Sequence, residues 1–257
     1  MDIFADYHAH TNLSYCCDPE ITPEFYVDII DAGLISAAAI TDHSMAIYFP
    51  PSVAWSWDFI FDSTLFDEYR EYGNKRLEEH LNNLAEYTKK GIIPGLEAEM
   101  MEDGRLTFDM SLRNKIKVLI GSVHYLPYGH LTDTQEILKH WKVHVFMLLN
   151  SGIDIIGHPF RWMEKICPPD EKTIRNAVME AGRAHVAMEL NSHDISPRTD
   201  MMMLMAAAEC GTKISLGTDT HHPAEAADFS YHMKIIKHCG LKLSDLNLYE
   251  YHPLISL

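Results

Sequence analysis

The segment VLIGSVHY, residues 118–125, shows the pattern that decides the fold of this chain. Its apolar residues hardly alternate with polar ones, which is typical of a strand buried on both faces in a parallel sheet. It then ends in His124 and Tyr125, and an imidazole can bind a metal ion. Six further apolar runs end in a histidine, a carboxylate or an amide: IFADYHAH (3–10), SAAAITDH (36–43), IIPGLEAE (92–99), IDIIGHPF (153–160), HVAMELNS (185–192) and ISLGTDTH (214–221). This repetition predicts one site to which seven strands contribute.

Amphipathic segments separate these runs, and each of them ends at or just before a glycine. The expected helices are residues 23–32, 66–90, 133–151, 170–181, 198–210 and 223–239. Thr22 and Pro23 suit the N-cap and first position of the first helix, and the glycines suit left-handed C-caps. Strands that alternate with helices predict a parallel α/β architecture. Because ligand-type residues follow nearly every strand, a barrel is favoured over an open sheet, whose outer strands would lie too far from one central site.

Length and composition favour one globular domain, residues 1–257, with no linker or second core. The formal net charge of −16 argues against a long nucleic acid as partner, because such binding needs Lys and Arg to neutralise phosphates. Five cysteines, an odd number, and no secretory segment predict reduced thiols and a cytoplasmic protein. No apolar run approaches the roughly 20 residues that span a bilayer, so no membrane partner is expected. The oligomeric state is not indicated.

Residues 44–65, SMAIYFPPSVAWSWDFIFDSTL, form an aromatic insertion directly after His43. Its place at the ligand-bearing end of a strand suggests a lid or a wall of the substrate pocket. The alternative is a surface loop that packs its own aromatic side chains together.

The strand-end residues have the chemistry of metal ligands. His8 and His10 form an H-x-H pair whose side chains share one face of a strand, and Asp219 and His221 repeat this spacing. Glu97 could bridge two cations, and Glu99, two residues further along the same face, is the less favoured rival. The remaining expected ligands are the histidines of three other strands and one loop carboxylate: His124 and His158 for a second ion, and Asp18 and His43, with His221, for a third. Nitrogen and carboxylate ligands together suit zinc, manganese or iron.

Each of these motifs has a structural interpretation when taken alone, and only their joint occurrence predicts a metal site. Cys16 and Cys17 lie near the first histidine pair, so one of them could contact metal, although loop positions without a ligand role are the simpler interpretation. The histidines outside the strand ends are expected to be solvated or satisfied by local hydrogen bonds: residues 80, 130, 140, 144, 185, 193, 232, 238 and 252.

Taken in order, the motifs resemble those of the PHP (polymerase and histidinol phosphatase) family over nearly the whole chain. They are DYHAHT (6–11), Asp18 followed by TPE (22–24), ITDH (40–43), PGLE (94–97), GSVH (121–124), IGH (156–158), ELN (189–191) and LGTDTHHP (216–223). The length and the GSVHY and ELN segments look most like the monofunctional histidinol-phosphate phosphatases.

The resemblance implies a distorted (β/α)7 barrel that holds three divalent ions of zinc, manganese or iron. By position, the first ion would take His8, His10, Glu97 and Asp219, the second Glu97, His124 and His158, and the third Asp18, His43 and His221. Arginines past the fifth and sixth strands bind the substrate phosphate in the phosphatases, and Arg161 and Arg198 lie in those stretches. Around Arg198 (SHDISPRTD) the sequence departs from the expected pattern, as does the aromatic insertion, which puts histidinol phosphate itself in doubt.

The predicted activity is therefore metal-assisted hydrolysis of a small phosphate monoester, of the histidinol-phosphatase type. Glu97 and Asp219 would act in catalysis through the ions, and His222, or a water, would protonate the leaving group. A phosphodiesterase, a nucleotide-cleaving enzyme that stacks its substrate on Trp55 or Trp57, and a protein tyrosine phosphatase of the same family are the alternatives. A metal-binding module without activity is a third possibility.

Overall fold

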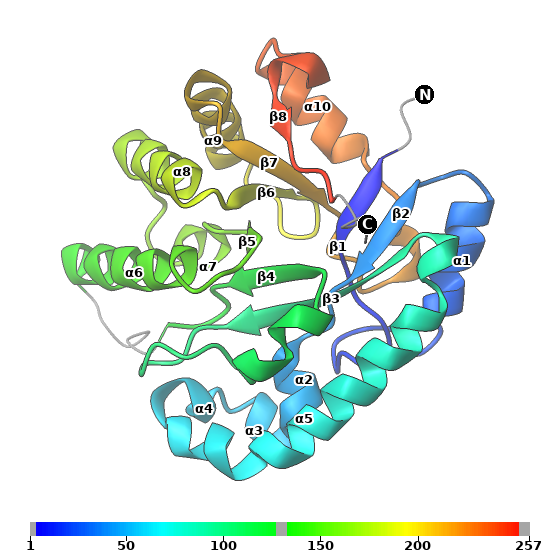
Figure 1. Cartoon of the computed structure of the whole chain (residues 1–257). Helices are drawn as coiled ribbons and strands as arrows, with labels where there is room; N and C mark the ends of the chain where they lie inside the picture. The colour runs from blue at the N-terminus through cyan, green and yellow to red at the C-terminus, as the bar shows by residue number, and fades with distance from the viewer. Residues whose placement is uncertain (1–3, 127–132, 252–257) are drawn as a thin grey trace.

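The computed structural model describes residues 4–126 and 133–251, and within them eight parallel strands follow one another around a curled sheet (Figure 1). The strands are β1 (Ala5–Ala9), β2 (Ala37–Ile40), β3 (Ile92–Glu99), β4 (Val118–Ser122), β5 (Ile155–Gly157), β6 (Ala187–Asn191), β7 (Lys213–Gly217) and β8 (Asn247–Leu248). Strands β1 to β7 lie in the seven expected apolar runs. The predicted α/β, TIM-like barrel architecture is thus confirmed, with helices between the strands.

The eighth strand was not predicted, because it consists of two residues that pair only with the start of β7. At the other end of β7 the sheet curls back on itself, where Ala9 and Thr220 form a parallel bridge. Next to this bridge the amide of Asp219 donates to the carbonyl of His8 at 2.7 Å. The first and last long strands therefore meet at their carboxyl ends, the end at which the ligand-type residues lie.

The helices cover the outside of the sheet, and in Figure 1 they form its outer ring. They are α1 (Pro23–Asp31), α2 (Ser44–Tyr48), α3 (Pro51–Ala54), α4 (Asp58–Phe61), α5 (Ser63–Glu86), α6 (Thr134–Leu149), α7 (Arg161–Glu164), α8 (Glu171–Ala184), α9 (Pro197–Cys210) and α10 (Ser230–His238). Short 3-10 helices occupy Thr88–Lys90, Met110–Lys115, Pro223–Glu225 and Leu243–Asp245. As expected, the Thr22 side chain caps α1 by accepting from the amide of Phe25, and Pro23 is its first residue. Of the histidines expected outside the site, His130 and His252 lie outside the described residues.

The expected helix over 223–239 is wrong in its first third. A 3-10 turn, Pro223–Glu225, comes first, and Ala227 then takes a left-handed φ of +60°, which no helix tolerates. Helix α10 begins only after Asp228, whose carboxylate accepts from the amide of Ser230 at 2.9 Å. The turn matters because the carboxylate of Glu225, its last residue, accepts from the amide of His221 at 2.7 Å and so fixes the loop that carries this residue.

The expected end of the helix over 170–181 is also wrong, because α8 runs through Gly182 to Ala184. Its left-handed C-cap is His185, with φ +59°. Gly182 is a glycine for a steric reason instead: a Cβ there would lie 2.6 Å from Oγ1 of Thr212. That hydroxyl donates to the carbonyl of Val178 at 3.0 Å, so strand β7 approaches α8 at this point.

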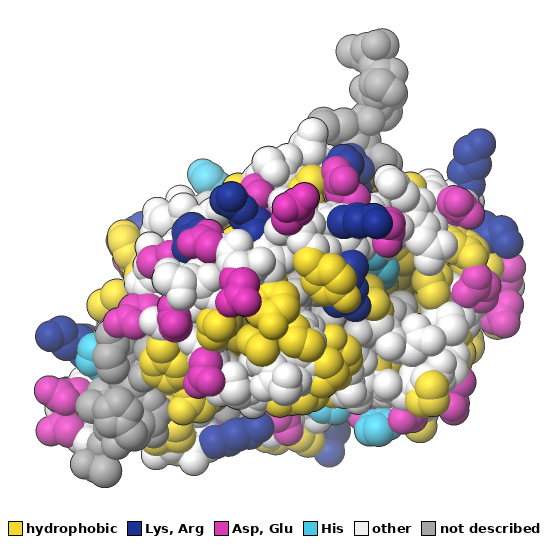
Figure 2. Space-filling model, turned by 90° about the horizontal axis from the view of Figure 1, so that it is seen from below, with side chains coloured by type: hydrophobic (Ala, Val, Ile, Leu, Met, Phe, Trp, Pro, Cys, Tyr) yellow, Lys and Arg dark blue, Asp and Glu magenta, His cyan; other side chains and the backbone are white. Residues whose placement is uncertain are grey.

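The aromatic insertion over 44–65 folds into the three short helices α2, α3 and α4. All five residues of α2 are buried, as are Phe49, Phe59 and Ile60. Other side chains of this region are exposed, and Figure 2 shows hydrophobic side chains gathered on the face of the molecule where α3, α4 and α5 run. Trp55 is 48% exposed and Phe61 41% exposed. The insertion thus packs against the core on one side and presents aromatic rings on the other.

The interior of the barrel has two layers that lie on the same faces of the strands. Toward the amino ends, a separate apolar cluster fills it: Tyr7, Ala39, Ile93, Val118, Ile120, Ile155 and Ala187. Alternate residues of a strand share a face, so the side chains that follow these at even spacing point into the same interior. Glu97 follows Ile93 in this way, and His124 follows Ile120. Regular strand geometry therefore delivers Glu97 and His124 to the carboxyl-end layer, whereas in β1, where His8 directly follows Tyr7, the pairing with β2 is irregular between Asp6 and Ala9.

Glycines make room between the two layers. A Cβ on Gly217 would lie 2.2 Å from Oε1 of Glu189 and 2.6 Å from Cβ of His8. A Cβ on Gly157 would lie 2.4 Å from Oγ of Ser122. These positions exclude a side chain, and the space is used by the buried carboxylate of Glu189.

Candidate metal centre

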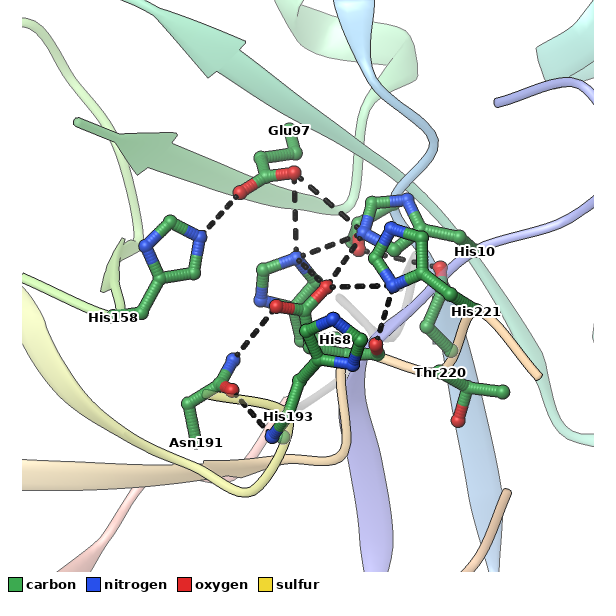
Figure 3. Close-up of polar contacts among 12 residues, drawn as sticks. His8, His10, Glu97, His158, Asn191, His193, Thr220 and His221 are labelled. Carbon is green, nitrogen blue, oxygen red and sulfur yellow. Dashed lines mark hydrogen bonds and ion pairs between the residues drawn. The ribbon is translucent and has the colours of Figure 1, made fainter. Parts of the chain in front are cut away.

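Four ligand-type side chains from β1, β3 and the end of β7 meet at one point (Figure 3). The Nε2 atoms of His8 and His10 lie 3.1 Å apart. Oε2 of Glu97 lies 3.4 Å from Nε2 of His8 and 3.6 Å from Nε2 of His10. Oδ1 of Asp219 lies 3.0 Å from Nε2 of His10 and 3.5 Å from that of His8. Two imidazole nitrogens and two carboxylate oxygens thus face one small volume, and all four residues are buried.

Glu97 also faces the histidines of three further strands. Its Oε1 lies 3.1 Å from Nε2 of His158 and 3.5 Å from Nε2 of His124. Its Oε2 lies 2.7 Å from Nδ1 of His43. A single carboxylate with one oxygen toward each of two histidine sets has the arrangement of a bridging ligand.

The arrangement of these side chains is that of ligands around metal ions rather than that of groups that satisfy one another by hydrogen bonds. In five overlapping groups, nitrogen and oxygen atoms lie within 4.8 Å of one another: His8, His10 and Asp219; His8, Glu97 and His158; His10, His43 and His221; His43, Glu99 and His124; His193, His221 and Glu225. Among the described side chains, Oε2 of Glu97 and Nδ1 of His43 are buried without a well-aligned hydrogen-bond partner. Two Nε2 atoms 3.1 Å apart cannot both carry a proton, so at least one lone pair faces the centre. Buried polar atoms left in this state are costly unless a cation satisfies them.

Three of these histidines have their other ring nitrogen held from behind, whereas Nδ1 of His158 is buried without a partner among the described residues. Nδ1 of His8 lies 2.8 Å from Oε1 of Glu189, and Nδ1 of His124 lies 3.1 Å from Oε1 of Glu99. Nδ1 of His221 lies 2.7 Å from the carbonyl of Asp219. Metal-binding histidines in proteins almost always donate their second N–H in this way, which fixes the tautomer and aims the free nitrogen at the ion.

His10 is held through a relay that begins at β2. The hydroxyl of Ser14 lies 3.3 Å from Nδ1 of His10 and donates to Oδ1 of Asp42 at 2.7 Å. Asp42 also accepts from the amide and hydroxyl of Thr11, both at 2.7 Å, and lies 3.3 Å from Nε2 of His80 on α5. Sequence reasoning gave no role to Ser14, Asp42, Glu189 or His80. The signal was present for Asp42 and Glu189, since they stand inside the ITDH and ELN motifs.

Two of the strand-end residues take backbone conformations that L-residues rarely adopt. His158 has φ +25° and Asp219 has φ +55°. Such a residue costs of order 1–3 kcal/mol and persists where the surrounding structure fixes it. The left-handed turn lets the chain leave the strand while the side chain still reaches the centre.

Burial and the neighbouring charges shift the pKa values of the site carboxylates in opposite directions. Burial favours the neutral form of Glu97 and Asp219, but the charge of His8 and further positive groups hold both pKa values well below their usual range. Burial and the neighbouring His43 lower the pKa of His10 to about 3. The carboxylates are therefore ionised and His10 is neutral at pH 7, the protonation states in which these groups bind cations.

The outer residues of the predicted site differ in their placement. Nη2 of Arg161 donates to Oδ2 of Asp219 at 2.6 Å and to Oδ1 of Asn191 at 2.8 Å, at the edge of the centre. Arg198 instead lies exposed in the first turn of α9. Asp18 and His222 pair with each other at 2.9 Å, and the His222 side chain is 59% exposed. Asp18 is in none of the groups that could hold an ion.

Most of the chain matches one known protein family. Residues 6–193 match the model of the PHP domain. This chain belongs to the PHP domain family. The matched range ends before Asp219 and His221, yet both side chains lie in the centre of this PHP domain.

Named relatives of this PHP protein include phosphatases and a polymerase. A probable phosphatase of Thermoanaerobacter sp. (strain X514) is 27% identical over 157 residues, which are 58% of this chain and 60% of the relative. The DNA polymerase/3′-5′ exonuclease of Bacillus subtilis is 26% identical over 138 residues, 54% of this chain and 23% of the polymerase. The chain thus spans about three fifths of the length of the phosphatase it matches.

One solved structure matches most of the chain. It is the histidinol phosphate phosphatase of Lactococcus lactis in complex with zinc, L-histidinol and phosphate, with 19% identity and a TM-score of 0.57. The match covers 93% of this chain and 94% of the other, which shows that the two share a fold. Within residues 4–126 and 133–251, no helix is both long and apolar enough to cross a bilayer.

A pocket of about 260 Å³ opens beside the centre of this PHP domain. Its lining combines three tryptophans with charged groups: Trp55, Trp57, Trp162, Arg161, Lys165 and Asp194, with Cys16, His43, His124, His193 and His221 on the side of the centre. His193 was expected to be unremarkable, but its ring lies 4.7 Å from that of His221 and its Nδ1 lies 3.2 Å from Oε1 of Glu225. The insertion thus forms a wall of this pocket through Trp55 and Trp57.

Proposed function

We propose that this protein is a metal-dependent hydrolase of small phosphate monoesters, of the histidinol-phosphatase type. The observation that carries the proposal is the convergence on Glu97 of histidine nitrogens from the ends of four other strands, β1, β2, β4 and β5, with the guanidinium of Arg161 at the edge. Relatives named as probable phosphatases and a structural neighbour named as a histidinol phosphate phosphatase support it.

In this proposal three divalent ions of zinc, manganese or iron are held by the overlapping groups. His8, His10, Asp219 and Glu97 would hold the first, Glu97, His158 and His124 the second, and His43 and His221 would contribute to the third. When bound, such ions polarise phosphoryl oxygens and lower the pKa of a bound water toward neutrality. All of these residues except His124, whose side chain is 15% exposed, are buried, which limits the access of bulk water and strengthens these electrostatic effects.

Arg161 would orient the phosphoryl group. Its side chain is 11% exposed, and although burial opposes its charge, the adjacent Asp219 raises its pKa, so it is always cationic. Nη2 is used by Asp219 and Asn191. Within the described residues Nη1 makes no hydrogen bond, which leaves one donor of a planar fork for a phosphate oxygen.

A proton must reach the leaving alkoxide. The predicted donor, His222, is held at the surface by Asp18 and does not line the pocket. His193 lines the pocket, and Glu225 orients its ring. We therefore assign the proton at Nε2 of His193 to this step, with Glu225 on Nδ1 selecting the tautomer.

The test is a screen of metal-reconstituted protein against a panel of phosphomonoesters that includes L-histidinol phosphate. We expect release of inorganic phosphate that chelation abolishes and that re-addition of metal restores. A chromogenic diester in the same panel separates monoesterase from diesterase activity. Folded, metal-loaded protein that releases no phosphate from any monoester would contradict the proposal.

A second candidate is a phosphatase or nucleotide-cleaving enzyme whose substrate carries a large planar group. The three tryptophans of the pocket favour it, because aromatic rings stack on planar leaving groups. Phosphotyrosine and nucleoside monophosphates in the panel test it against histidinol phosphate. A metal-binding module without activity would show bound metal and no turnover on any of these compounds.

A further inference from the structure

We propose that Trp55 selects the substrate by stacking its indole ring on a planar aromatic group of the leaving alcohol. The proposal rests on the proposed function and deepens it, since it names which of the three pocket tryptophans recognises the substrate. Trp55 belongs to the insertion over 44–65, where the sequence departs from the phosphatases that it otherwise resembles.

The indole ring of Trp55 has uncovered surface beside the metal centre. Trp55 lines the pocket of about 260 Å³ together with Arg161, whose guanidinium would orient the phosphoryl group. It is 48% exposed. Within residues 4–126 and 133–251, no aromatic ring packs against that of Trp55, whereas three rings pack against that of Trp57. Trp55 can therefore offer a ring face to a ligand at a site where a phosphate monoester would bind.

Trp57 lines the same pocket, but its ring is engaged by the protein. It lies nearly parallel to the ring of Tyr125, with centroids 6.2 Å apart and an interplanar angle of 15°. The rings of Phe59 and His124 lie 5.8 Å and 5.9 Å from it. Its backbone has a left-handed φ of +61°, a conformation that persists where the surrounding structure fixes it. Trp57 therefore supports the wall of the pocket.

The third tryptophan of the pocket, Trp162, is only 8% exposed. Its side chain belongs to the main hydrophobic core of the protein. Burial leaves this ring little surface for a ligand, so Trp55 is the tryptophan that remains for recognition.

The segment that carries Trp55 is anchored before any substrate binds. Trp55 is the C-cap of α3, and its amide donates to the carbonyl of Pro51 at 3.0 Å. The hydroxyl of the next residue, Ser56, donates to the carbonyl of Val53 at 2.9 Å. Ala54, directly before Trp55, is fully buried. A ring on a fixed backbone binds a ligand without the entropy cost of ordering a loop.

The size of the pocket limits the class of substrate. Its volume of about 260 Å³ is just below the roughly 300–1,000 Å³ that is typical of small-molecule sites. Aromatic rings attract one another in offset stacks, an attraction that a saturated ring of similar size lacks. The inferred substrates are therefore small phosphate monoesters whose alcohol carries one planar ring system.

Benzyl phosphate and cyclohexylmethyl phosphate separate stacking from size, because both release a primary alcohol and only the first has a planar ring. We measure kcat/KM for both esters with metal-reconstituted, full-length wild type, Trp55→Leu and Trp55→Phe. We expect the wild type to prefer the benzyl ester at least about fivefold. Trp55→Leu should abolish this preference, and Trp55→Phe, which keeps a planar ring, should retain most of it.

Phe61→Leu is the matched control. Phe61 is an aromatic residue of the same insertion and is 41% exposed, but it is not among the described residues that line the pocket. This variant should keep the preference of the wild type, and circular dichroism checks that every variant is folded. No preference in the wild type, or a preference that survives in Trp55→Leu, would overturn the assignment. A preference lost in Trp57→Leu but kept in Trp55→Leu would also overturn it and assign stacking to Trp57.

Binding is measured apart from turnover with 2-phenylethylphosphonate and 2-cyclohexylethylphosphonate, in which a methylene group replaces the ester oxygen. Calorimetric titration of the metal-loaded protein should show tighter binding of the phenyl compound to the wild type and equal binding of the two to Trp55→Leu. That result without turnover of either ester would support the role of Trp55 and contradict the proposed function. Turnover of both esters with equal kcat/KM would contradict stacking and leave the proposed function intact. Binding of neither phosphonate would overturn the role of Trp55.

Discussion

The two ends of the barrel interior are formed by the same strands, yet one holds only apolar side chains and aromatic rings while the other holds histidines and carboxylates. At the amino ends, seven residues from Tyr7 to Ala187 pack as a separate cluster beneath Tyr249 and Tyr251. At the carboxyl ends, His8, His10, Glu97 and Asp219 share a buried volume. The comparison teaches that a strand supplies packing with its first residues and chemistry with its last.

The largest expected difference between the ends is in turnover. Asp219→Asn keeps the shape and removes the charge, and Asn tolerates the left-handed backbone at this position. We expect kcat/KM on the best monoester to fall more than about 100-fold, beyond the range typical of residues that only support a ligand. The melting temperature of the metal-free protein is expected to stay within a few degrees of the wild type. Full activity in this variant, or in His10→Ala, would contradict the assigned ligand roles.

At the other end, a substitution should cost stability and leave turnover intact. Ile120 is fully buried in the apolar cluster, four residues before His124 on the same face of β4. Ile120→Ala is expected to lower the free energy of unfolding by about 3 kcal/mol, since it leaves a cavity. Urea denaturation measures this loss, and kcat per folded molecule is expected to remain within twofold. A large loss of kcat with unchanged stability would mean that the two layers are not separable.

Glu189 lies between the two layers, and a substitution there refines the comparison of the two ends. It accepts from the amide of His158 at 2.6 Å and pairs with Nδ1 of His8 at 2.8 Å, so it supports ligands of the centre from behind. Glu189→Gln is expected to weaken metal binding 10- to 100-fold, the usual effect of losing an outer partner of a ligand. Competition against a chelator measures the affinity, and Glu209→Gln on the surface of α9 is the control. Unchanged affinity would show that Glu189 only packs.

His144 shows what burial does to a histidine without carboxylate neighbours. Burial lowers its pKa to about 4, whereas Glu189, Asp219 and Glu97 overcome burial and raise the pKa of His8. The unfolded chain binds a proton at His144 near pH 6.5, so stability is lost as the pH falls from there toward 4. Between pH 7.5 and 5 this single group costs about 2 kcal/mol.

His144→Leu removes that pH dependence. The difference in unfolding free energy between variant and wild type, measured in urea at pH 7.5 and 5, is expected to shift by about 2 kcal/mol in favour of the variant at the lower pH. A pH-independent difference would mean that His144 titrates normally in the folded protein.

The sequence predicted the strands and the fold because each strand is a local pattern, an apolar run closed by a ligand-type residue. What it missed depends on contacts between distant segments. The carboxylate of Asp18, for instance, pairs with Nδ1 of His222 at 2.9 Å, although the backbone amide of Asp18 donates to the carbonyl of His221. Strand β8 is too short to have a pattern, and only its pairing with Lys213 and Ile214 defines it.

The roles of the residues that hold the metal ligands in place could not be predicted from the sequence for the same reason. Glu189 and Asp42 stand in motifs that were recognised, but nothing local shows that their partners are the far nitrogens of His8 and His10. The helix over 170–181 was predicted to end before Gly182, because a glycine often forms the C-cap of a helix. In the structure this glycine is needed for the close approach of Thr212, and the sequence does not distinguish the two roles. Arg198 and His222 were predicted to be in the site, but both side chains are exposed. A residue that is near a site in the sequence can still have its side chain directed to solvent.

The left-handed backbone at His158 and Asp219 has a consequence for any attempt to evolve or engineer this protein. At both positions glycine would relieve the strain, so selection for thermostability alone, carried out without metal, would enrich glycine there. Such selection would erase the two side chains while appearing to improve the protein. Screens for hardier variants should therefore hold residues 158 and 219 constant.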